Sequence, residues 1–312
     1  APRLHARQIV SCQPRASHHI GVERLFPDRV ISVEEVHPAD ESGVVLFRPE
    51  KNWERLNKSA VRMSMPEVPK ELFMNGLQQL IQLDRDFIPK SAGSSLYIRP
   101  FMIGTEPFIG VKTSDRYLFM IIIGPVGPYY GEAISVLVYD TYIRATKGGY
   151  GNAKAAGNYA GTLYPVELAR KQGYKDVLWL DGEHKKYVNE VGTMNIFFVV
   201  DGVLITPETD GAILEGITRD SIIQIAKSLG IPVEERVIAI DEIVAAHDNG
   251  TLTEMFGTGT AAVVNPVNRF GYKGKDYLLD ETKYTVSARI KEQLVGIQKC
   301  TIEDTFGWVV EI

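Results

Sequence analysis

The chain has 312 residues, of which 45% are hydrophobic and 23% are charged, and this length suits one large domain or two of ordinary size. The formal net charge is −5 and the pI is near 5.8, which gives no reason to expect binding to nucleic acid or to an anionic membrane. The two cysteines, Cys12 and Cys300, stand far apart, so we expect no disulfide framework and a reducing compartment, the cytoplasm. The longest apolar run, residues 117–126, is too short to cross a bilayer, and we expect no secretory signal at the start of the chain.

Two helices are predicted in the first third of the chain. The first begins at Arg48-Pro49 and runs to about residue 63, because proline is tolerated in the first turn of a helix. Its apolar residues recur at helical spacing: Leu56, Ala60 and Met63. Arg55 lies on this helix, where an arginine is most often exposed. The second helix spans about residues 70–83, with four residues facing inward: Phe73, Leu77, Leu80 and Ile81.

A strand is predicted over residues 95–105, and it carries Tyr97-Ile98-Arg99-Pro100. Alternation places Tyr97 and Arg99 on one face of the strand. These two side chains form either a plain polar pair on the sheet or the lining of a site for a substrate side chain that is sometimes a carboxylate. A loop over residues 106–111 follows, and residues 117–123 are predicted to form a buried strand.

The clearest boundary in the chain is Gly124-Pro125-Val126-Gly127-Pro128, because glycine and proline interrupt regular structure. We therefore predict a small domain over residues 1–124, a linker over residues 125–134 and a larger domain over residues 135–312. A short strand over residues 136–139 opens the larger domain.

Lys154 lies in a segment of small residues, 145–160, with glycines at 148, 149, 151 and 157. Glycine lets another group approach the backbone closely. A lysine in a cleft can lose its proton and attack a carbonyl carbon to form a Schiff base. The alternative is a solvated lysine in a glycine-rich turn, and this segment alone favours the alternative. Asn158 is predicted to cap a helix that runs to Lys171 and is closed by Gly173.

The second half of the chain alternates strands and helices. Strands are predicted at residues 176–180 and around Glu190 in residues 187–197, and a hairpin turns at Asp201-Gly202. Thr218 and Asp241 are predicted to cap helices that run to residues 229 and 250. A cap needs no ligand, yet the free amides at a helix start also bind phosphate. Residues 254–262 are predicted to form a strand that enters a Gly-Thr-Gly-Thr turn, which could hold an anion, and a last helix is expected over residues 287–297.

Several separated motifs occur in the order found in one enzyme family. They are Tyr97-x-Arg-Pro, Val126-Gly-Pro-Tyr, Lys147-Gly-Gly-x-Gly-x-x-Lys-x-x-Gly-Asn-Tyr, Glu190-x-Gly-x-x-Asn-x-Phe and Gly216-Ile-Thr-Arg. Over residues 44–312 the chain resembles the branched-chain amino acid aminotransferases, which are pyridoxal 5′-phosphate (PLP) enzymes of fold type IV. The resemblance implies a mixed α/β (α+β) fold, with a small α/β domain and a larger domain built on a barrel-like sheet flanked by helices.

The resemblance also implies how the cofactor would be bound. Lys154 would hold PLP covalently and shuttle a proton, and Tyr159 would contact the ring oxygen. Glu190 would face the pyridine nitrogen, where a carboxylate favours the protonated ring. Arg55 would bind the phosphate with its planar fork. The remaining phosphate contacts would come from Ile217, Thr218 and Thr260. No metal site is expected.

Substrate contacts follow from the same resemblance. Tyr97, Arg99 and Tyr129 would line the side-chain pocket, although Tyr129 is equally well explained as packing at a hinge. The amides of Thr260 and Ala261 would bind the substrate carboxylate. Relatives are homodimers, in which the apolar residues of the 106–111 loop would reach the partner's site: Ile109 and Val111. Some animal members carry a redox Cys-x-x-Cys beginning at the position of Ala262, and this chain has Asn265 at the second position.

The expected reaction is transamination between leucine, isoleucine or valine and 2-oxoglutarate, and the sequence does not rank these amino acids or separate biosynthesis from breakdown. Two enzymes of the same fold, D-amino acid aminotransferase and aminodeoxychorismate lyase, are alternatives, and so is a non-catalytic protein that binds phosphorylated ligands. The family's Phe-Glu-Gly-x-Lys-Ala-Tyr motif has no counterpart in residues 24–36. One hypothesis is that residues 1–43 as written come from a shifted reading frame, which peptide mapping of the purified protein would test.

Overall fold

The computed structural model describes residues 3–5, 30–31, 34–39, 43–91, 94–127 and 132–312. Contacts between Cα atoms divide the chain into two compact units. The first unit comprises residues 1–128, 153–160 and 297–312, and the second comprises residues 129–152 and 161–296. These units are not the predicted domains, which were divided by a linker at residues 125–134. That division stays a prediction.

The first unit contains a seven-stranded sheet in the order β1-β6-β5-β3-β4-β16, with β2 paired to β5. Only β1 runs parallel to its neighbour β6, and the other pairs are antiparallel. The longest pair is β5 with β6, and it sets the alternation of side chains over the two faces of the sheet. The strands are β1 (Arg3–His5), β2 (Val30–Ile31), β3 (Glu34–Ala39), β4 (Gly43–Phe47), β5 (Ser95–Gly104), β6 (Arg116–Val126) and β16 (Val309–Glu311).

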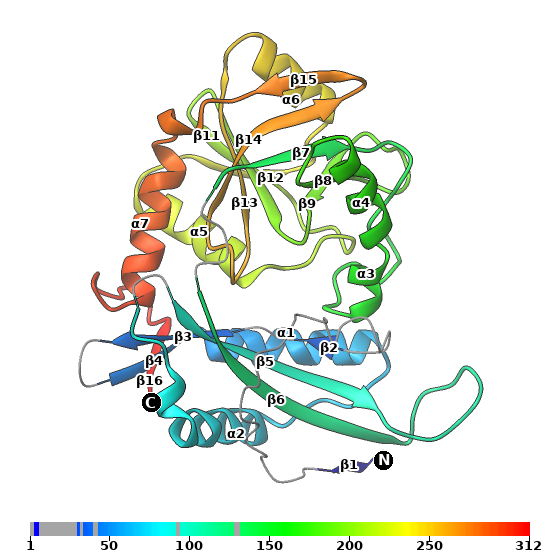
Figure 1. Cartoon of the computed structure of the whole chain (residues 1–312), viewed down its shortest axis with the longest axis vertical. Helices are drawn as coiled ribbons and strands as arrows, with labels where there is room; N and C mark the ends of the chain where they lie inside the picture. Colours follow the sequence, from blue (N-terminus) through cyan, green and yellow to red (C-terminus); the bar gives the residue numbers. More distant parts are fainter. Residues whose placement is uncertain (1–2, 6–29, 32–33, 40–42, 92–93, 128–131) are drawn as a thin grey trace. The chain divides into compact units, whose positions relative to one another are not determined.

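Two helices of the first unit, α1 (Pro49–Arg62) and α2 (Lys70–Leu83), confirm the sequence prediction (Figure 1). The predicted inward residues of α2 are all buried, and Leu56 and Ala60 of α1 are buried as well. Leu56 and Ala60 pack with Phe73, Leu77 and Ile81 of α2 and with Leu96 and Ile98 of β5 in one hydrophobic cluster. This burial of a helical stripe against one sheet face stabilises the unit. A short 3-10 helix (Arg85–Phe87) and α3 (Ala156–Ala160) complete the unit.

The sequence predicted a buried strand at residues 117–123. The strand is present, but the prediction that it is buried is wrong. It forms the middle of β6, but of its residues only Tyr117 is buried, and Ile122 is 45% exposed. One face of β6 packs on the helices and the other does not, so an apolar run here does not mean burial on both faces. The strand also continues through Gly124 and Pro125, which pair with β5.

The second unit contains a nine-stranded sheet in the order β12-β11-β10-β13-β14-β7-β8-β9, with β15 paired to β14. The sheet mixes parallel pairs, such as β7 with β8, and antiparallel pairs, such as β10 with β13. It curls into a half-barrel with flanking helices, which confirms the fold expected from the family resemblance. The strands are β7 (Ile134–Val138), β8 (Asp176–Leu180), β9 (Val188–Val191), β10 (Asn195–Val200), β11 (Val203–Pro207), β12 (Val233–Arg236), β13 (Leu252–Thr258), β14 (Asn265–Tyr272) and β15 (Lys275–Leu278).

The described residues of the second unit contain the helices α4 (Leu163–Lys171), α5 (Ile217–Ser228) and α6 (Ile240–Asp248) and a 3-10 helix at Glu281–Lys283. They also contain most of α7 (Val286–Gln298), whose last two residues belong to the first unit. The core lies inside the curled sheet and under α6, where the strands contribute almost continuous apolar side chains. The hairpin predicted at Asp201-Gly202 is confirmed, because both residues have positive φ, as a two-residue hairpin turn requires.

Three predicted helix caps are wrong. Asn158 lies inside the short helix α3, and its amide donates to the carbonyl of Ala153, so α4 begins later, after Thr162. Thr218 is the second residue of α5, whose cap is Gly216. Asp241 is the second residue of α6, whose cap is Ala239. In each case a polar residue favoured at caps falls in the first turn or inside the helix because neighbouring contacts fix where the helix begins.

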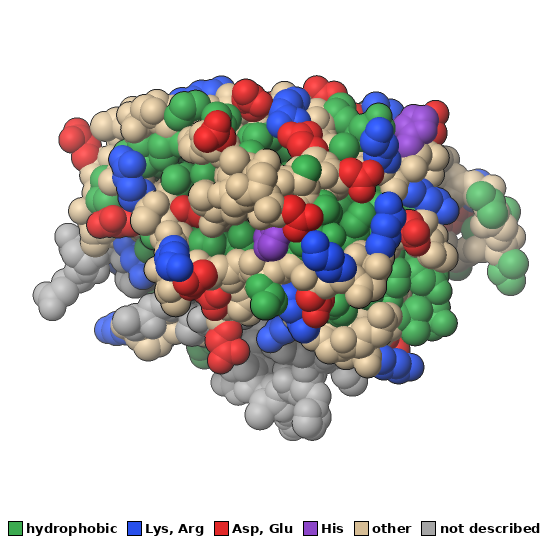
Figure 2. Space-filling view, turned by 90° about the horizontal axis from the view of Figure 1, so that it is seen from above, with side chains coloured by type: hydrophobic (Ala, Val, Ile, Leu, Met, Phe, Trp, Pro, Cys, Tyr) green, Lys and Arg blue, Asp and Glu red, His purple; other side chains and the backbone are tan. Residues whose placement is uncertain are grey.

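Acidic and basic side chains are interspersed on the face shown in Figure 2, in keeping with the modest net charge. Within the described ranges, no helix combines the length and the apolar character needed to cross a membrane.

Candidate active site

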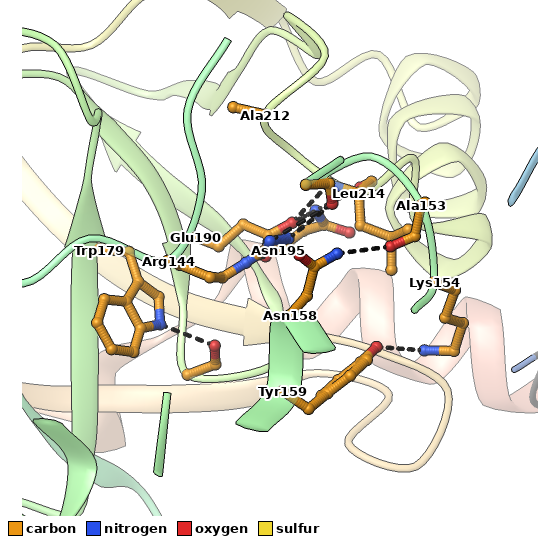
Figure 3. A network of polar contacts seen from close by, with 12 residues as sticks. Arg144, Ala153, Lys154, Asn158, Tyr159, Trp179, Glu190, Asn195, Ala212 and Leu214 are labelled. Carbon is orange, nitrogen blue, oxygen red and sulfur yellow. Dashed lines mark hydrogen bonds and ion pairs between the residues drawn. The ribbon is translucent and has the colours of Figure 1, made fainter. Parts of the chain in front are cut away.

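The side chain of Lys154 is bonded rather than free in solvent. Its Nζ donates to the Tyr159 hydroxyl at 2.8 Å (Figure 3). Its backbone N–H donates to Ser59 Oγ at 2.9 Å, and the flanking Ala153 and Ala155 are buried. The backbone on both sides of Lys154 is therefore fixed, and its amine is bonded to the Tyr159 phenol.

Arg55 lies on α1, and it is only 8% exposed, which contradicts the common expectation for a helix arginine. Its Nη2 donates to Asn52 Oδ1 at 3.2 Å. Its carbonyl accepts a hydrogen bond from Ser59 Oγ at 2.9 Å. Ser59 thus bonds to both Arg55 and Lys154, so the first unit brings these two predicted residues together through one hydroxyl.

Tyr97 and Arg99 share one face of β5, as alternation predicted. Arg99 Nη2 donates to the Tyr97 hydroxyl at 2.8 Å, and the guanidinium lies 5.1 Å from the ring centroid. Both side chains are half-buried. The pair could present a positive charge and a phenol to a ligand, or stabilise the sheet face without one.

Ile109 and Val111 lie in the loop that follows β5. Both are fully exposed, at 100% and 107% relative accessibility. Tyr129, the remaining predicted substrate contact, lies outside the described residues.

Glu190 on β9 is the centre of a buried polar cluster in the second unit (Figure 3). It is only 3% exposed, so it is not a solvated residue on the surface of the strand. Its Oε1 accepts the Leu214 N–H at 2.8 Å and the Asn195 amide at 3.4 Å, and its Oε2 accepts Arg144 Nε at 2.5 Å. A guanidinium, a backbone amide and a side-chain amide thus fix the orientation of this carboxylate.

Asn195 of this cluster also contacts the residues just before α5. Asn195 also donates to the Leu214 carbonyl at 2.9 Å. A Cβ at position 216 would lie 2.0 Å from Asn195 Oδ1, so only glycine fits there. The helix then begins at Ile217, and its cap residue Gly216 has no side chain that could bond to the first amides. A helix start of this kind, with a buried Thr218 in its first turn, is an arrangement that binds anions.

The predicted anion-binding turn lies after β13. Thr258 Oγ1 donates to the Val263 carbonyl at 2.6 Å, and the Val263 N–H donates to the Gly259 carbonyl at 2.7 Å. These bonds close a compact loop whose half-buried Thr260 and Ala261 stand at its tip. Val263 adopts φ 52, which is unusual for a β-branched residue and marks a constrained turn.

Sequence reasoning missed Arg144 entirely and assigned Asn195 no role. Asn195 is a fixed position of the Glu-x-Gly-x-x-Asn-x-Phe motif, so a signal was present for it. Arg144 stands alone in the segment between a strand and the glycine-rich loop, and nothing in its sequence neighbourhood predicts burial beside a carboxylate. Among the described residues no group of histidine, cysteine and acidic side chains could hold a metal ion.

Known proteins are similar to this chain in sequence and in fold. The family model for amino-transferase class IV matches residues 33–270. "Branched-chain-amino-acid aminotransferase 2" of Bacillus subtilis (strain 168) is 45% identical over 316 aligned positions, which cover 100% of this chain and 85% of that protein. "Branched-chain-amino-acid transaminase 1" of the same organism is 49% identical over 278 positions, covering 88% of this chain and 78% of that protein.

A solved structure extends the likeness to the fold. The T.th. branched-chain amino acid aminotransferase with pyridoxamine 5′-phosphate superposes with a TM-score of 0.78 and 27% identity, covering 95% of this chain and 93% of that one. The family match spans well over half of the residues and agrees with the curled sheet and the ordered motifs. The chain therefore belongs to the class IV aminotransferases.

Proposed function

We propose that this enzyme transfers the amino group between L-leucine, L-isoleucine or L-valine and 2-oxoglutarate, giving branched-chain 2-oxo acids and L-glutamate. The observation that carries the proposal is the 45% and 49% identity to two branched-chain transaminases over most of the chain. Class IV aminotransferases use PLP, and the T.th. structure holds the related pyridoxamine 5′-phosphate.

The chemistry of the residues fits PLP. An aldehyde cofactor requires an amine, and Lys154 supplies one beside a phenol. A carboxylate beside the pyridine nitrogen favours the protonated ring, and Glu190 is a buried carboxylate paired with an arginine. A phosphate requires hydrogen-bond donors, and the backbone N–H groups at the start of α5, after Gly216, would supply them. When bound, PLP supplies an electron sink for negative charge at the substrate α-carbon.

In this proposal each residue has one task at a stated atom. Lys154 Nζ would hold the cofactor, and the same amine would move a proton at the substrate α-carbon. Tyr159 orients Nζ through the 2.8 Å hydrogen bond and contacts the ring oxygen. Glu190 keeps a proton on the ring nitrogen. The phosphate would be bound by Arg55, Ile217, Thr218 and Thr260.

The substrate would be bound by a second set of residues. The amides of Thr260 and Ala261 take the α-carboxylate. Tyr97 and Arg99 admit the glutamate side chain, because the guanidinium matches a carboxylate, while Tyr129 supplies an aromatic wall. Ile109 and Val111 of a partner subunit in a homodimer would supply apolar walls for leucine, isoleucine and valine. We propose the cytoplasm as the compartment, since the chain has only two cysteines, far apart in sequence.

A substrate panel with 2-oxoglutarate as acceptor tests the proposal, with the Lys154→Ala variant alongside. We expect turnover of the three branched-chain amino acids, and a loss of about 10³-fold or more in the variant, because it lacks the amine that moves the proton. Turnover of D-amino acids alone, or release of pyruvate from aminodeoxychorismate, would assign a different reaction of the same fold. A colourless protein without turnover would indicate a phospholigand-binding protein. Undiminished turnover in Lys154→Ala would refute the assignment.

A further inference from the structure

Arg144 binds two groups that lie far apart in the sequence. Its side chain is 9% exposed, and its Nε donates to Glu190 Oε2 at 2.5 Å. Its Nη1 and Nη2 both approach the Gly151 carbonyl, at 3.4 and 3.2 Å. One planar guanidinium therefore joins the carboxylate of β9 to the backbone of the glycine-rich loop that precedes Lys154 (Figure 3).

The two oxygens of Glu190 are not equivalent. Oε1 accepts two donors, the Leu214 N–H and the Asn195 amide. Oε2 accepts one donor, Arg144 Nε. A carboxylate offers about four lone-pair positions, two on each oxygen. The position left for a further donor is therefore on Oε2, next to the guanidinium.

The loop bound by Arg144 is also joined to the segment that binds Glu190. The Asn152 N–H donates to the Gly211 carbonyl at 3.2 Å. Gly151 packs so closely that a Cβ there would lie 2.2 Å from the Ala212 carbonyl oxygen. Leu214, three residues from Gly211, donates its N–H to Glu190. Arg144, Glu190, the 211–214 segment and the 151–152 segment thus form a closed ring of contacts within the second unit.

We infer that Arg144 is a positioning residue for the cofactor: it fixes which oxygen of Glu190 faces the pyridine nitrogen, and it holds the backbone of the loop that leads to Lys154. The inference rests on the proposed function for the identity of the cofactor. It adds a residue that touches neither cofactor nor substrate in the proposed site, but acts through Glu190 and Gly151.

The residue type matters because the two contacts must be made together. A guanidinium is planar, stays charged and carries five N–H donors in a fixed fork. A lysine ammonium at this position could neutralise Oε2 but could not also bond to the Gly151 carbonyl in the same plane. A glutamine would leave Glu190 as a buried charge without its partner, which is costly. The two substitutions therefore separate the charge of Arg144 from its shape.

The test compares Arg144→Gln and Arg144→Lys with a matched control, Arg269→Gln. Arg269 also joins a carboxylate, that of Asp276, to a backbone carbonyl, that of Gly173, in the same unit. PLP affinity of the apoenzymes is measured by quenching of tryptophan fluorescence, and the orientation of bound PLP by its induced circular dichroism. Hydrogen exchange of residues 145–152 is measured in the apoenzymes.

We expect Arg144→Gln to weaken PLP binding by about tenfold or more, since it strands a buried charge, and to reduce the induced dichroism. Arg144→Lys should restore most of the affinity and yet leave the amides of residues 145–152 exchanging faster than in the wild type. Arg269→Gln should match the wild type in all three measurements. Wild-type affinity, dichroism and exchange in both Arg144 variants would overturn the inference, as would equal losses in Arg269→Gln.

If Arg144→Gln does not fold, Arg144→Lys and the double variant Arg144→Gln/Glu190→Gln, which carries no stranded charge, supply the same comparison. The double variant should lose only a little more PLP affinity than Glu190→Gln alone, because the part of the effect that acts through the carboxylate is already lost and only the contact with Gly151 is removed in addition. Additive losses would overturn the inference. Failure of the wild type to act on branched-chain amino acids would refute the proposed function. The hydrogen-exchange measurement on the apoenzyme would then still test the contacts of Arg144 with Glu190 and Gly151.

Discussion

At the scale of single residues, two glycines of the family motifs are explained by polar neighbours. A Cβ at position 216 would meet Asn195 Oδ1 at 2.0 Å, and a Cβ at position 192 would meet Asp176 Oδ2 at 2.2 Å. Gly192 also has φ 54, which a side chain rarely tolerates. The glycines of these two motifs are therefore required by the close approach of a polar side chain, and not by flexibility.

Asp176 leads to a prediction about pH. Burial raises the pKa of its carboxyl above the usual value, although the Val177 N–H and the charge of Arg170 act in the opposite direction. Because the folded pKa is above the unfolded one, the native state binds the proton more tightly, and the stability contribution is full below the unfolded pKa. It is lost as the pH rises through the folded pKa. Asp176→Asn, which cannot ionise, should therefore raise the free energy of unfolding at pH 7 relative to the wild type.

Denaturant titrations of wild type and Asp176→Asn between pH 4 and 8 measure this effect, with PLP present throughout. The difference in stability should shrink toward the acidic end, where the wild-type carboxyl is protonated. The control is Asp220→Asn, the same exchange at an exposed position in the first turn of α5, which tests whether the gain depends on burial. A variant that is less stable than the wild type at pH 7 would show that the charge of Asp176 is needed.

At the scale of elements, the spacing of apolar residues was sufficient to predict the helices that have a strong apolar stripe. The four inward residues predicted for the 70–83 helix are buried, and its bounds match α2. Helix starts were less predictable, because a cap preference is worth only about 1 kcal/mol and packing overrides it. At α5 the start is set by the contact of Gly216 with Asn195, and the threonine that resembles a cap falls inside the helix.

The start of α7 shows a cap that no local sequence pattern reveals. Glu254 on β13 is 2% exposed, and its carboxylate accepts the N–H groups of Thr285, Val286 and Ser287 at 2.7, 2.7 and 2.8 Å. A carboxylate at a helix start satisfies free amides and complements the helix dipole. Glu254→Gln should therefore lower the free energy of unfolding by about 1–3 kcal/mol, because its amide NH₂ would face backbone donors.

Thermal unfolding of the holoenzyme followed by circular dichroism measures the loss for Glu254→Gln. Glu292→Gln, an exposed change on the same helix, is the control and should stay within about 0.5 kcal/mol of the wild type. Equal stability of the two variants would mean that the bonds from Glu254 contribute nothing net to α7.

At the scale of the whole molecule, the sequence was enough to identify the family, because its motifs recur in order and the family model matches. The fold followed from that family. What the motifs could not provide was the set of neighbours that hold each motif residue, such as Ser59 for Lys154 and Arg144 for Glu190. Such neighbours come from distant segments, and no periodicity or local spacing connects residues 46 or 95 positions apart.

The loop after β5 is a candidate contact with a second subunit. Its base is held by polar contacts, since Lys112 Nζ bonds to Glu106 at 2.7 Å and the Asp115 N–H to Glu106 at 2.9 Å. Its apolar Ile109 and Val111 are nonetheless fully exposed. An ordered loop that presents apolar side chains to solvent is typical of a surface that a partner covers, which supports the proposed homodimer with these residues in the partner's substrate pocket.

The double variant Ile109→Asp/Val111→Asp separates this role from folding. Because neither side chain is buried in its own chain, the variant should unfold within about 0.5 kcal/mol of the wild type. Two charges in an apolar pocket should raise the KM for leucine by about tenfold or more. They should also weaken the proposed dimer, which sedimentation velocity would measure. Leu278→Asp, at an exposed apolar site with 67% accessibility on β15, should change neither quantity. A double variant with the wild-type KM and the wild-type sedimentation coefficient would place the loop outside any subunit interface.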